Sequence, residues 1–303
     1  MHLLKQLCDI HGPSGNEENI KKFILHYINE NISSWLYTPE IIHGDDLHDC
    51  IILKFGQPRT AVFAHIDTIG FTVRYENQLI PIGGPEVETG YKIRGQDSLG
   101  SIECEILLDE DNRSYHNFAR QIERGTDLSF VPKFKETANY IQCCSLDNRL
   151  GVYNALKIAE TLKDGVIVFS CYEEHGGGTM PFLIKYIYEQ YNIHQALVSD
   201  ITWVTDGVLP GKGVVISLRD RSIPRKSFIN RIIKIAEISN VQFQLEVESE
   251  GSSDGREIQH SPYPIDWCFI GAPEQNVHTP FEKVYKGDIA SMIELYQILL
   301  SEL

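Results

Sequence analysis

The sequence lacks the features that mark several classes of protein. It contains no run of about 18 consecutive apolar residues, so no membrane-spanning helix is expected. The apolar stretch at the start is too short for a signal peptide. Basic residues are few, because 27 Lys and Arg stand against 42 Asp and Glu and leave a formal charge of -15. Without a basic stripe, we expect neither nucleic acid nor a membrane as a partner.

Signals for disulfide bonds or cysteine-based metal sites are also missing. The seven cysteines are odd in number, include no CxxC pair and lie mostly within apolar runs. This pattern indicates reduced thiols and predicts a cytoplasmic protein. A hydrophobic fraction of 42% and a charged fraction of 23% are ordinary for a globular chain. The length of 303 residues allows one large domain or two.

Most of the chain alternates between patterns typical of strands and of helices. Short apolar runs predict buried strands, and apolar residues at helical spacing predict helices. This alternation predicts an α/β fold with a mixed central sheet and helices on both faces. Residues 12–28 are expected to form a turn and then a helix, and further helices are expected over 148–163, 179–191, 224–239 and 287–303. The expected strands cover 50–53, 61–64, 165–172, 195–202, 213–218, 243–249 and 265–271.

The pattern differs between residues 70 and 142. Short alternating segments there are separated by Gly, Pro and Asp or Asn clusters, which predicts a small antiparallel sheet or barrel. We favour a separate inserted β-domain over a β-excursion packed on the main domain. The expected division is therefore one domain from residues 1–69 and 143–303, and an inserted all-β domain from residues 70–142.

Five residues that suit a metal ion stand where apolar runs end or loops begin. Imidazole and carboxylate groups are ligands that a zinc-like ion takes. In α/β sheets, ligands bind beyond the carboxyl ends of the strands, where side chains from different strands converge. Each residue also has an ordinary structural interpretation, such as a helix N-cap for an Asp. The five are His65, Asp147, Glu174, Asp200 and His278.

Two neighbours of these residues have a chemical reason to belong to the site. Glu173 and Glu174 are adjacent carboxylates that repel each other unless a cation lies between them, so one can bind metal and the other can move protons. Asp67, two residues after His65, can accept the second N–H of its imidazole. A glycosidase pair, with carboxylates roughly 5–5.5 Å apart, fits poorly because adjacent strand residues point to opposite faces. His175 is the strongest rival ligand.

Motifs from the whole chain together resemble one family. The sequence resembles the tetrahedral, or deblocking and glutamyl, aminopeptidases, which are di-metal metallopeptidases. The resemblance implies a zinc-peptidase-like fold with a β-domain inserted after the strand that carries His65, and a homo-oligomer acting on short peptides. The motifs that carry it are, in order, GPSGNE, AHIDTIGF, SLDNRLG, YEEHGGGT, SDIT, GKGVVISLRD, SSDGREIQ and VHTPFEKVYKGDI.

The same resemblance implies a role for each candidate residue. It implies two divalent ions, zinc in the first place, with cobalt or manganese as alternatives. Two ions lower the pKa of a shared water and stabilise the charge that develops on the carbonyl oxygen. Asp147 would bridge both ions, His65 and Asp200 would complete one site, Glu174 and His278 would complete the other, Asp67 would orient His65, and Glu173 would be the general base.

Some positions depart from the family pattern and leave substrate preference and rate open. Thr68, Asn148, His175 and the segment 274–277 each replace a residue usual in the family. A related carboxypeptidase or amidohydrolase with the same metal site is one alternative. A catalytically weak relative that binds peptides within an assembly is another, and the retained ligand set disfavours it.

Three arginines in the segment SLRDRSIPR lie near the expected substrate side. Arg219, Arg221 and Arg225 either recognise an acidic first residue of the substrate or form ordinary surface pairs with Asp220. We favour the surface pairs.

Overall fold

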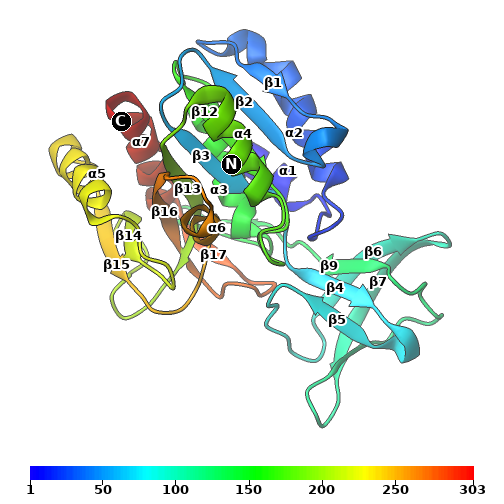
Figure 1. Cartoon of the computed structure of the whole chain (residues 1–303). Coiled ribbons are helices and arrows are strands. Elements are labelled where there is room, and N and C mark those ends of the chain that lie inside the picture. Colours follow the sequence, from blue (N-terminus) through cyan, green and yellow to red (C-terminus); the bar gives the residue numbers. More distant parts are fainter.

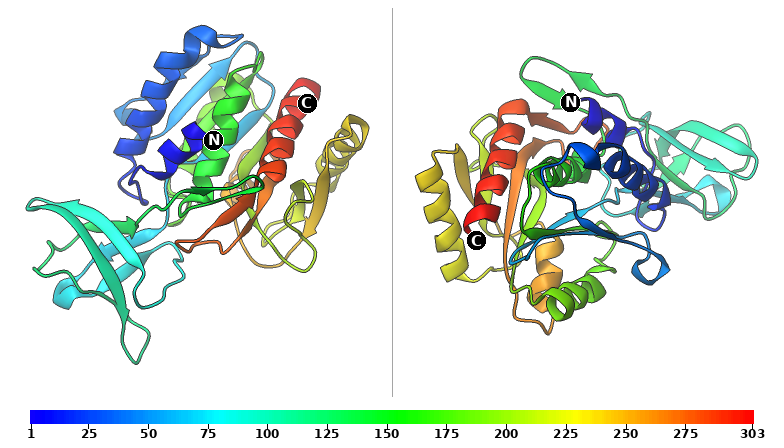
Figure 2. Two further views of the ribbon diagram at one scale, coloured as in Figure 1. Left: turned by 180° about the vertical axis from the view of Figure 1, so that it is seen from behind. Right: turned by 90° about the horizontal axis from the view of Figure 1, so that it is seen from above.

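The computed structural model describes residues 1–303 and contains two β-sheets, one of 11 strands and one of six. The larger sheet lies in a helix-covered lobe, and the smaller sheet forms a second lobe that projects from it (Figures 1 and 2). The predicted α/β class with an additional all-β unit is confirmed.

The larger sheet is mixed, as expected. Strand β3 lies between β12 and β13 and runs parallel to both, while β16 runs parallel to β13. Antiparallel strands complete the two sides. The strands are β1 (Glu40–Ile42), β2 (Ile51–Phe55), β3 (Ala61–His65), β10 (Lys135–Glu136), β11 (Tyr140–Gln142), β12 (Gly165–Ser170), β13 (Gln195–Trp203), β14 (Val214–Arg219), β15 (Phe243–Val247), β16 (Asp266–Gln275) and β17 (Lys283–Tyr285).

Helices cover both faces of this sheet. Helices α3 and α7 pack on one face, against β3 and β13 and against β14 and β16, and α1 packs on α3. Helices α4 and α6 lie on the other face (Figures 1 and 2). Because both faces are covered, every residue of β3 and β12 is buried, which explains their continuous apolar sequence. The helices are α1 (His2–Cys8), α2 (Glu18–Asn31), α3 (Leu146–Ala159), α4 (Met180–Tyr191), α5 (Lys226–Ser239), α6 (Asp254–His260) and α7 (Lys286–Glu302).

The smaller sheet is antiparallel throughout. Buried and exposed residues alternate along β7, as expected for a sheet with one covered face. Strands β10 and β11 also fall within residues 70–142, but they belong to the larger sheet, where β11 pairs with β17 and β10 pairs with β11. The domain boundaries therefore stay a prediction. The strands of the smaller sheet are β4 (Gly70–Val73), β5 (Leu79–Ile82), β6 (Lys92–Asp97), β7 (Gly100–Leu108), β8 (Ser114–His116) and β9 (Asp127–Phe130).

The five predicted helices are confirmed as α2, α3, α4, α5 and α7. Pro224, expected in the first turn of α5, precedes the helix, which begins at Lys226. Helices α1 and α6 were not predicted, because each has only seven residues and offers little periodicity. In α6 the start depends on Ser253, whose Oγ accepts the backbone N–H of Gly255.

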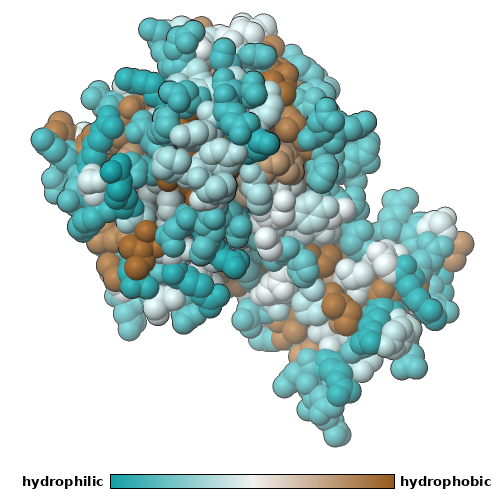
Figure 3. Space-filling model, in the orientation of Figure 1, coloured by the Kyte–Doolittle hydropathy of each residue, from teal (hydrophilic) through white to brown (hydrophobic).

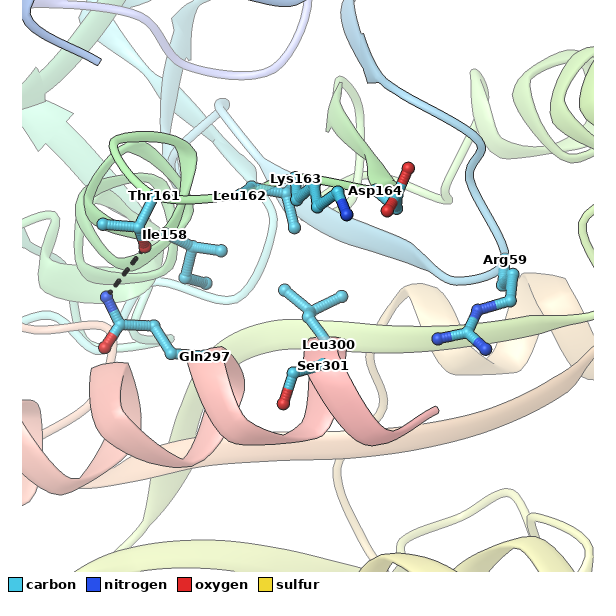
Figure 4. A pocket seen from close by; sticks show the side chains of 9 residues that line it. All are labelled: Arg59, Ile158, Thr161, Leu162, Lys163, Asp164, Gln297, Leu300 and Ser301. Atoms are coloured by element: carbon cyan, nitrogen blue, oxygen red, sulfur yellow. Dashed lines mark hydrogen bonds between the residues drawn. The ribbon is translucent and has the colours of Figure 1, made fainter. Parts of the chain in front are cut away.

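The surface is mainly hydrophilic on the face in Figure 3, with separate hydrophobic areas on both lobes. None of the helices is both long and apolar enough to cross a membrane. A hollow of about 290 Å³ lies between the ends of α3 and α7 (Figure 4). Arg59 and Asp164, which line it, precede β3 and β12, so this hollow lies at the amino ends of those strands.

Candidate metal centre

The candidate residues gather at the opposite edge of the sheet, around the carboxyl ends of β3, β12 and β13. His65 is the last residue of β3, and Glu173 and Glu174 follow β12. Asp200 was expected to end its strand, but β13 continues to Trp203. The pairing of β13 with β3 stops at Val198. Asp200 therefore lies beyond the last residue pair of these two strands and next to His65.

Asp147 lies at the centre of the group, at the start of α3. Its Oδ1 is 3.3 Å from His65 Nε2, and its Oδ2 is 3.3 Å from His278 Nε2. Asp200 Oδ2 lies 3.5 Å from His65 Nε2, and Glu174 Oε2 lies 3.3 Å from His278 Nε2. The structure thus brings all five predicted ligands together as two groups that share Asp147. In each group the ligand atoms lie within 4.8 Å of one another.

Both imidazoles are held through the nitrogen that faces away from Asp147. His65 Nδ1 lies 3.4 Å from Asp67 Oδ1, and His278 Nδ1 lies 3.0 Å from the carbonyl oxygen of Gly84. An N–H at Nδ1 leaves the lone pair on Nε2, which points into the site. Gly84 follows β5, so a segment of the smaller sheet supports the second group. A Cβ at Gly83, whose φ is +70°, would lie 3.1 Å from Glu174 Oε2, which favours glycine there.

Asp67 connects the end of β3 with the loop after β12. Its fully buried carboxylate accepts the Ser14 hydroxyl at 2.6 Å and the backbone N–H groups of Glu173 and Glu174 at 3.1 Å each. Burial alone would raise the pKa of Asp67, but the contacts with His65 and Ser14 outweigh it and lower that pKa. The carboxylate therefore fixes both the imidazole and the neighbouring pair of glutamates.

The crowding of carboxylates indicates that the site is built for cations. Burial raises the pKa of Glu174 to about 7 and that of Asp200 to about 6, and it raises the pKa of Glu173 well above its usual range. Nε2 of His65 and Oε1 of Glu174 are buried without a hydrogen bond. Such groups are costly to bury unless a ligand satisfies them. Imidazole nitrogen and carboxylate oxygen are donors that fit divalent zinc-like ions.

A comparison with known protein families agrees with this geometry. Residues 96–295 match the model of the M42 glutamyl aminopeptidase family. The chain belongs to this family. The predicted family resemblance is therefore confirmed, and the chain is a peptidase.

Individual relatives cover nearly the whole M42 chain. A proposed aminopeptidase of Acetivibrio thermocellus is 27% identical, and the alignment covers 97% of this chain and 96% of that protein. An aminopeptidase from the archaeon Desulfurococcus kamchatkensis has a similar structure, with a TM-score of 0.86, 21% identity, and 100% and 94% of the two chains covered. The TET1 peptidase of Pyrococcus horikoshii gives a TM-score of 0.84 at 20% identity, with 100% and 99% covered. Both structures share the fold of this M42 chain.

Three residues near the centre were missed as site residues, although they lie in the motifs that indicated the family. Arg149 is fully buried and donates hydrogen bonds to the backbone oxygens of Ile66 and Ile10. Glu282 Oε2 accepts the backbone N–H of Leu146 at 2.6 Å and that of Asp147 at 3.3 Å. These contacts hold the chain directly after His65 and at Asp147.

Asp254 is the third of these residues. Its buried carboxylate accepts the Ser170 hydroxyl at 2.6 Å, at the end of β12. Burial raises the pKa of Asp254 to about 7. The segment SSDG marked the position, but only the fold shows that α6 brings it next to the strand ends.

The departures from the M42 pattern have different environments. Thr68 and Asn148 are buried, and their side chains bond to the backbone oxygens of Gly12 and Ser199 respectively. His175 Nδ1 accepts the backbone N–H of Gly83 at 3.3 Å, and His175 belongs to neither metal group. His175, the rival metal ligand, therefore contacts the loop after β5, whose Gly84 also supports His278.

Replacing Ser14 with alanine should weaken metal binding in this M42 chain. The change removes one of the hydrogen bonds that orient Asp67 and, through it, His65. Loss of such a supporting contact typically reduces metal affinity by about tenfold or more. Calorimetric titration of metal-free protein with zinc measures this, with Ser34→Ala, which affects only an exposed hydroxyl bonded to Asn31, as the control. Equal zinc affinity in both variants contradicts the assigned contact.

Proposed function

We propose that the chain is a metal-dependent aminopeptidase that removes the N-terminal residue from short peptides. The observation that carries this proposal is the position of Asp147, with one imidazole on each of its carboxylate oxygens. Membership of the M42 glutamyl aminopeptidase family and the similarity to aminopeptidases over nearly the full chain support it.

Two divalent ions fit the two groups of ligands. The first would be held by His65, Asp147 and Asp200, and the second by Asp147, Glu174 and His278. Zinc suits these donors, and cobalt and manganese accept the same donors. Bound as a pair, the ions would lower the pKa of a shared water and stabilise negative charge on the carbonyl oxygen of the substrate.

Glu173 would be the general base. Its Oε2 lies 3.9 Å from His65 Nε2, at the border of the first group, and its side chain is 16% exposed, so water can reach it. Glu173 takes the proton of the attacking water and delivers it to the leaving amine. The backbone N–H of Glu173 donates to Asp67, which keeps the base next to the imidazole that Asp67 also orients.

The charge of the site favours an amino terminus over a carboxyl terminus. Besides the ligands Asp147, Glu174 and Asp200, the carboxylates of Asp67, Glu173 and Asp254 lie in or next to the centre. These carboxylates favour the ammonium group of a peptide and disfavour a terminal carboxylate. This balance favours an aminopeptidase over a carboxypeptidase.

We also propose that the protein forms a homo-oligomer. The TET1 peptidase of Pyrococcus horikoshii can assemble into a tetrahedron or a large octahedral shell, and this chain shares its fold over the full length. Light scattering on the purified protein tests the proposal. A mass several times that of the 34.5 kDa chain is expected, and a monomer mass contradicts it.

A cytoplasmic location and a separate domain within residues 70–142 are further parts of the proposal. All seven cysteines are unpaired and buried, which suits a reducing compartment. Cell fractionation tests the location, and recovery from a secreted fraction contradicts it.

The six-stranded sheet supports the inserted domain. Cleavage of the native protein by a protease within the smaller sheet, before any cut at its junctions with the larger lobe, contradicts that division.

Substituting Glu173 with glutamine should nearly abolish peptide hydrolysis while zinc remains bound. The amide cannot accept the proton, and a general base typically contributes on the order of 10²–10⁴-fold to the rate. We expect kcat on aminoacyl amide substrates to fall by that factor, with zinc content unchanged. Glu294→Gln, which neutralises an exposed carboxylate on α7, serves as the control.

The outcomes separate the proposal from its alternatives. If Glu173→Gln keeps nearly full activity, Glu173 is not the general base. Metal-loaded protein that cleaves only substrates with a blocked amino terminus indicates a carboxypeptidase or amidohydrolase. Protein that binds metal and peptides but cleaves none of them indicates a peptide-binding relative.

A further inference from the structure

A small pocket opens beside the first group of metal ligands. It has a volume of about 50 Å³ and is formed by the ends of β13, β14 and β15 and the segment before α6. Ile201, which lines it, donates its backbone N–H to Asp200 Oδ1 at 2.8 Å. Ser253, which also lines it, directly precedes Asp254. The pocket therefore borders the metal centre on the side of Asp200.

The charged groups that line this pocket are all acidic. They are Asp220, Glu246, Glu248 and Glu250. Asp220 and Glu246 are almost fully buried, neither carboxylate has an ion-pair partner, and burial raises the pKa of both. Glu250 lies at the exposed rim, where it pairs with Arg221 at 3.4 Å. Arg219 and Arg221 act on Asp220 from nearby, whereas Glu246 is hydrogen-bonded by the Thr202 hydroxyl and forms no ion pair.

A buried hydroxyl, that of Ser217, lies next to Glu246 behind the wall of the pocket. Ser217 pairs with Glu246 in the register of β14 and β15, so both side chains lie on the same face of the sheet. Ser217 is only 2% exposed, and its Oγ makes no hydrogen bond. The Ser217 and Thr202 hydroxyls therefore both face the carboxylate of Glu246, which keeps this side chain at the wall of the pocket.

The three arginines near this pocket do not make it a site for an acidic group. Arg225 pairs with Asp266, and Arg221 pairs with Glu250. Arg219 Nε donates to the backbone oxygen of Asp220 at 3.2 Å. The favoured interpretation as surface contacts agrees with the structure, although the carboxylate partners are Asp266 and Glu250 rather than Asp220. None of the three lines the pocket.

We propose that this pocket receives the side chain of the first residue of the substrate and selects a cationic one, lysine before arginine. The proposal rests on the aminopeptidase function proposed above. A buried water molecule requires roughly 10–15 Å³ of cavity volume. The pocket, with about 50 Å³, therefore holds about three to five groups of the size of a water molecule. That size suits the ammonium group and the last methylenes of lysine better than a guanidinium.

The walls of the pocket match the rest of a lysine side chain. Trp203, Ile201 and Phe269 supply apolar surface for the methylene stem, and Trp203 is 45% exposed. The ammonium group reaches Glu246 and Asp220 and forms charge-assisted hydrogen bonds. A leucine side chain gives these carboxylates no cationic partner, and a glutamate side chain is repelled by them.

Steady-state kinetics on a series of aminoacyl p-nitroanilides test the proposal. The full-length, zinc-loaded protein is assayed with lysyl, arginyl, leucyl and glutamyl substrates. We expect kcat/KM for the lysyl substrate to exceed that for the leucyl substrate by about tenfold or more, because a hydrogen bond to a charged group contributes at least that much. The glutamyl substrate should be the poorest.

Two variants connect the preference to the pocket. Glu246→Gln should lower the ratio of lysyl to leucyl kcat/KM by about tenfold. Glu248→Gln, closer to the surface, should lower it less and tests the pocket if the buried substitution prevents folding. Glu237→Gln removes an exposed charge on α5 and should leave the ratio unchanged.

The possible results also distinguish this proposal from the function on which it rests. If none of the substrates is cleaved by metal-loaded protein, the aminopeptidase function fails. If substrates are cleaved but the leucyl or glutamyl compound is preferred, the pocket proposal is overturned. An unchanged lysyl-to-leucyl ratio in both glutamate variants overturns it as well.

Discussion

The arrangement of the site depends on one carboxylate, that of Asp147, which faces His65 with one oxygen and His278 with the other. These two histidines are more than 200 residues apart in sequence. Their meeting requires β3 to end, α3 to begin and the loop between β16 and β17 to turn at the same place. Glu282 supports this junction, because its carboxylate accepts the backbone N–H groups at the start of α3.

The site also joins the two lobes of the molecule. The carbonyl oxygen of Gly84, from the segment after β5, lies next to His278 Nδ1, and the N–H of Gly83 donates to His175. The smaller sheet thus determines the orientation of an imidazole in the larger lobe. The buried carboxylates around it are unfavourable without cations. We therefore infer that metal binding stabilises both the centre and the contact between the lobes.

The sequence was informative where a residue lies at the end of an apolar run. His65, Glu174 and Asp200 could be predicted as neighbours because parallel strands bring their carboxyl ends to one edge. The contacts of Arg149 and Gly84 could not be predicted, because they depend on packing between distant segments. The strands β10 and β11 resemble those of the smaller sheet locally, and only the pairing of β11 with β17, over 140 residues later, shows where they belong.

The central claim is that Asp147 is shared by two metal ions. Crystals of the zinc-loaded protein, measured on both sides of the zinc absorption edge, test it most directly. The account predicts two anomalous peaks, one between Asp147 Oδ1 and His65 and the other between Asp147 Oδ2 and His278. A single peak at full zinc occupancy, or two peaks that Asp147 does not contact, would contradict the account.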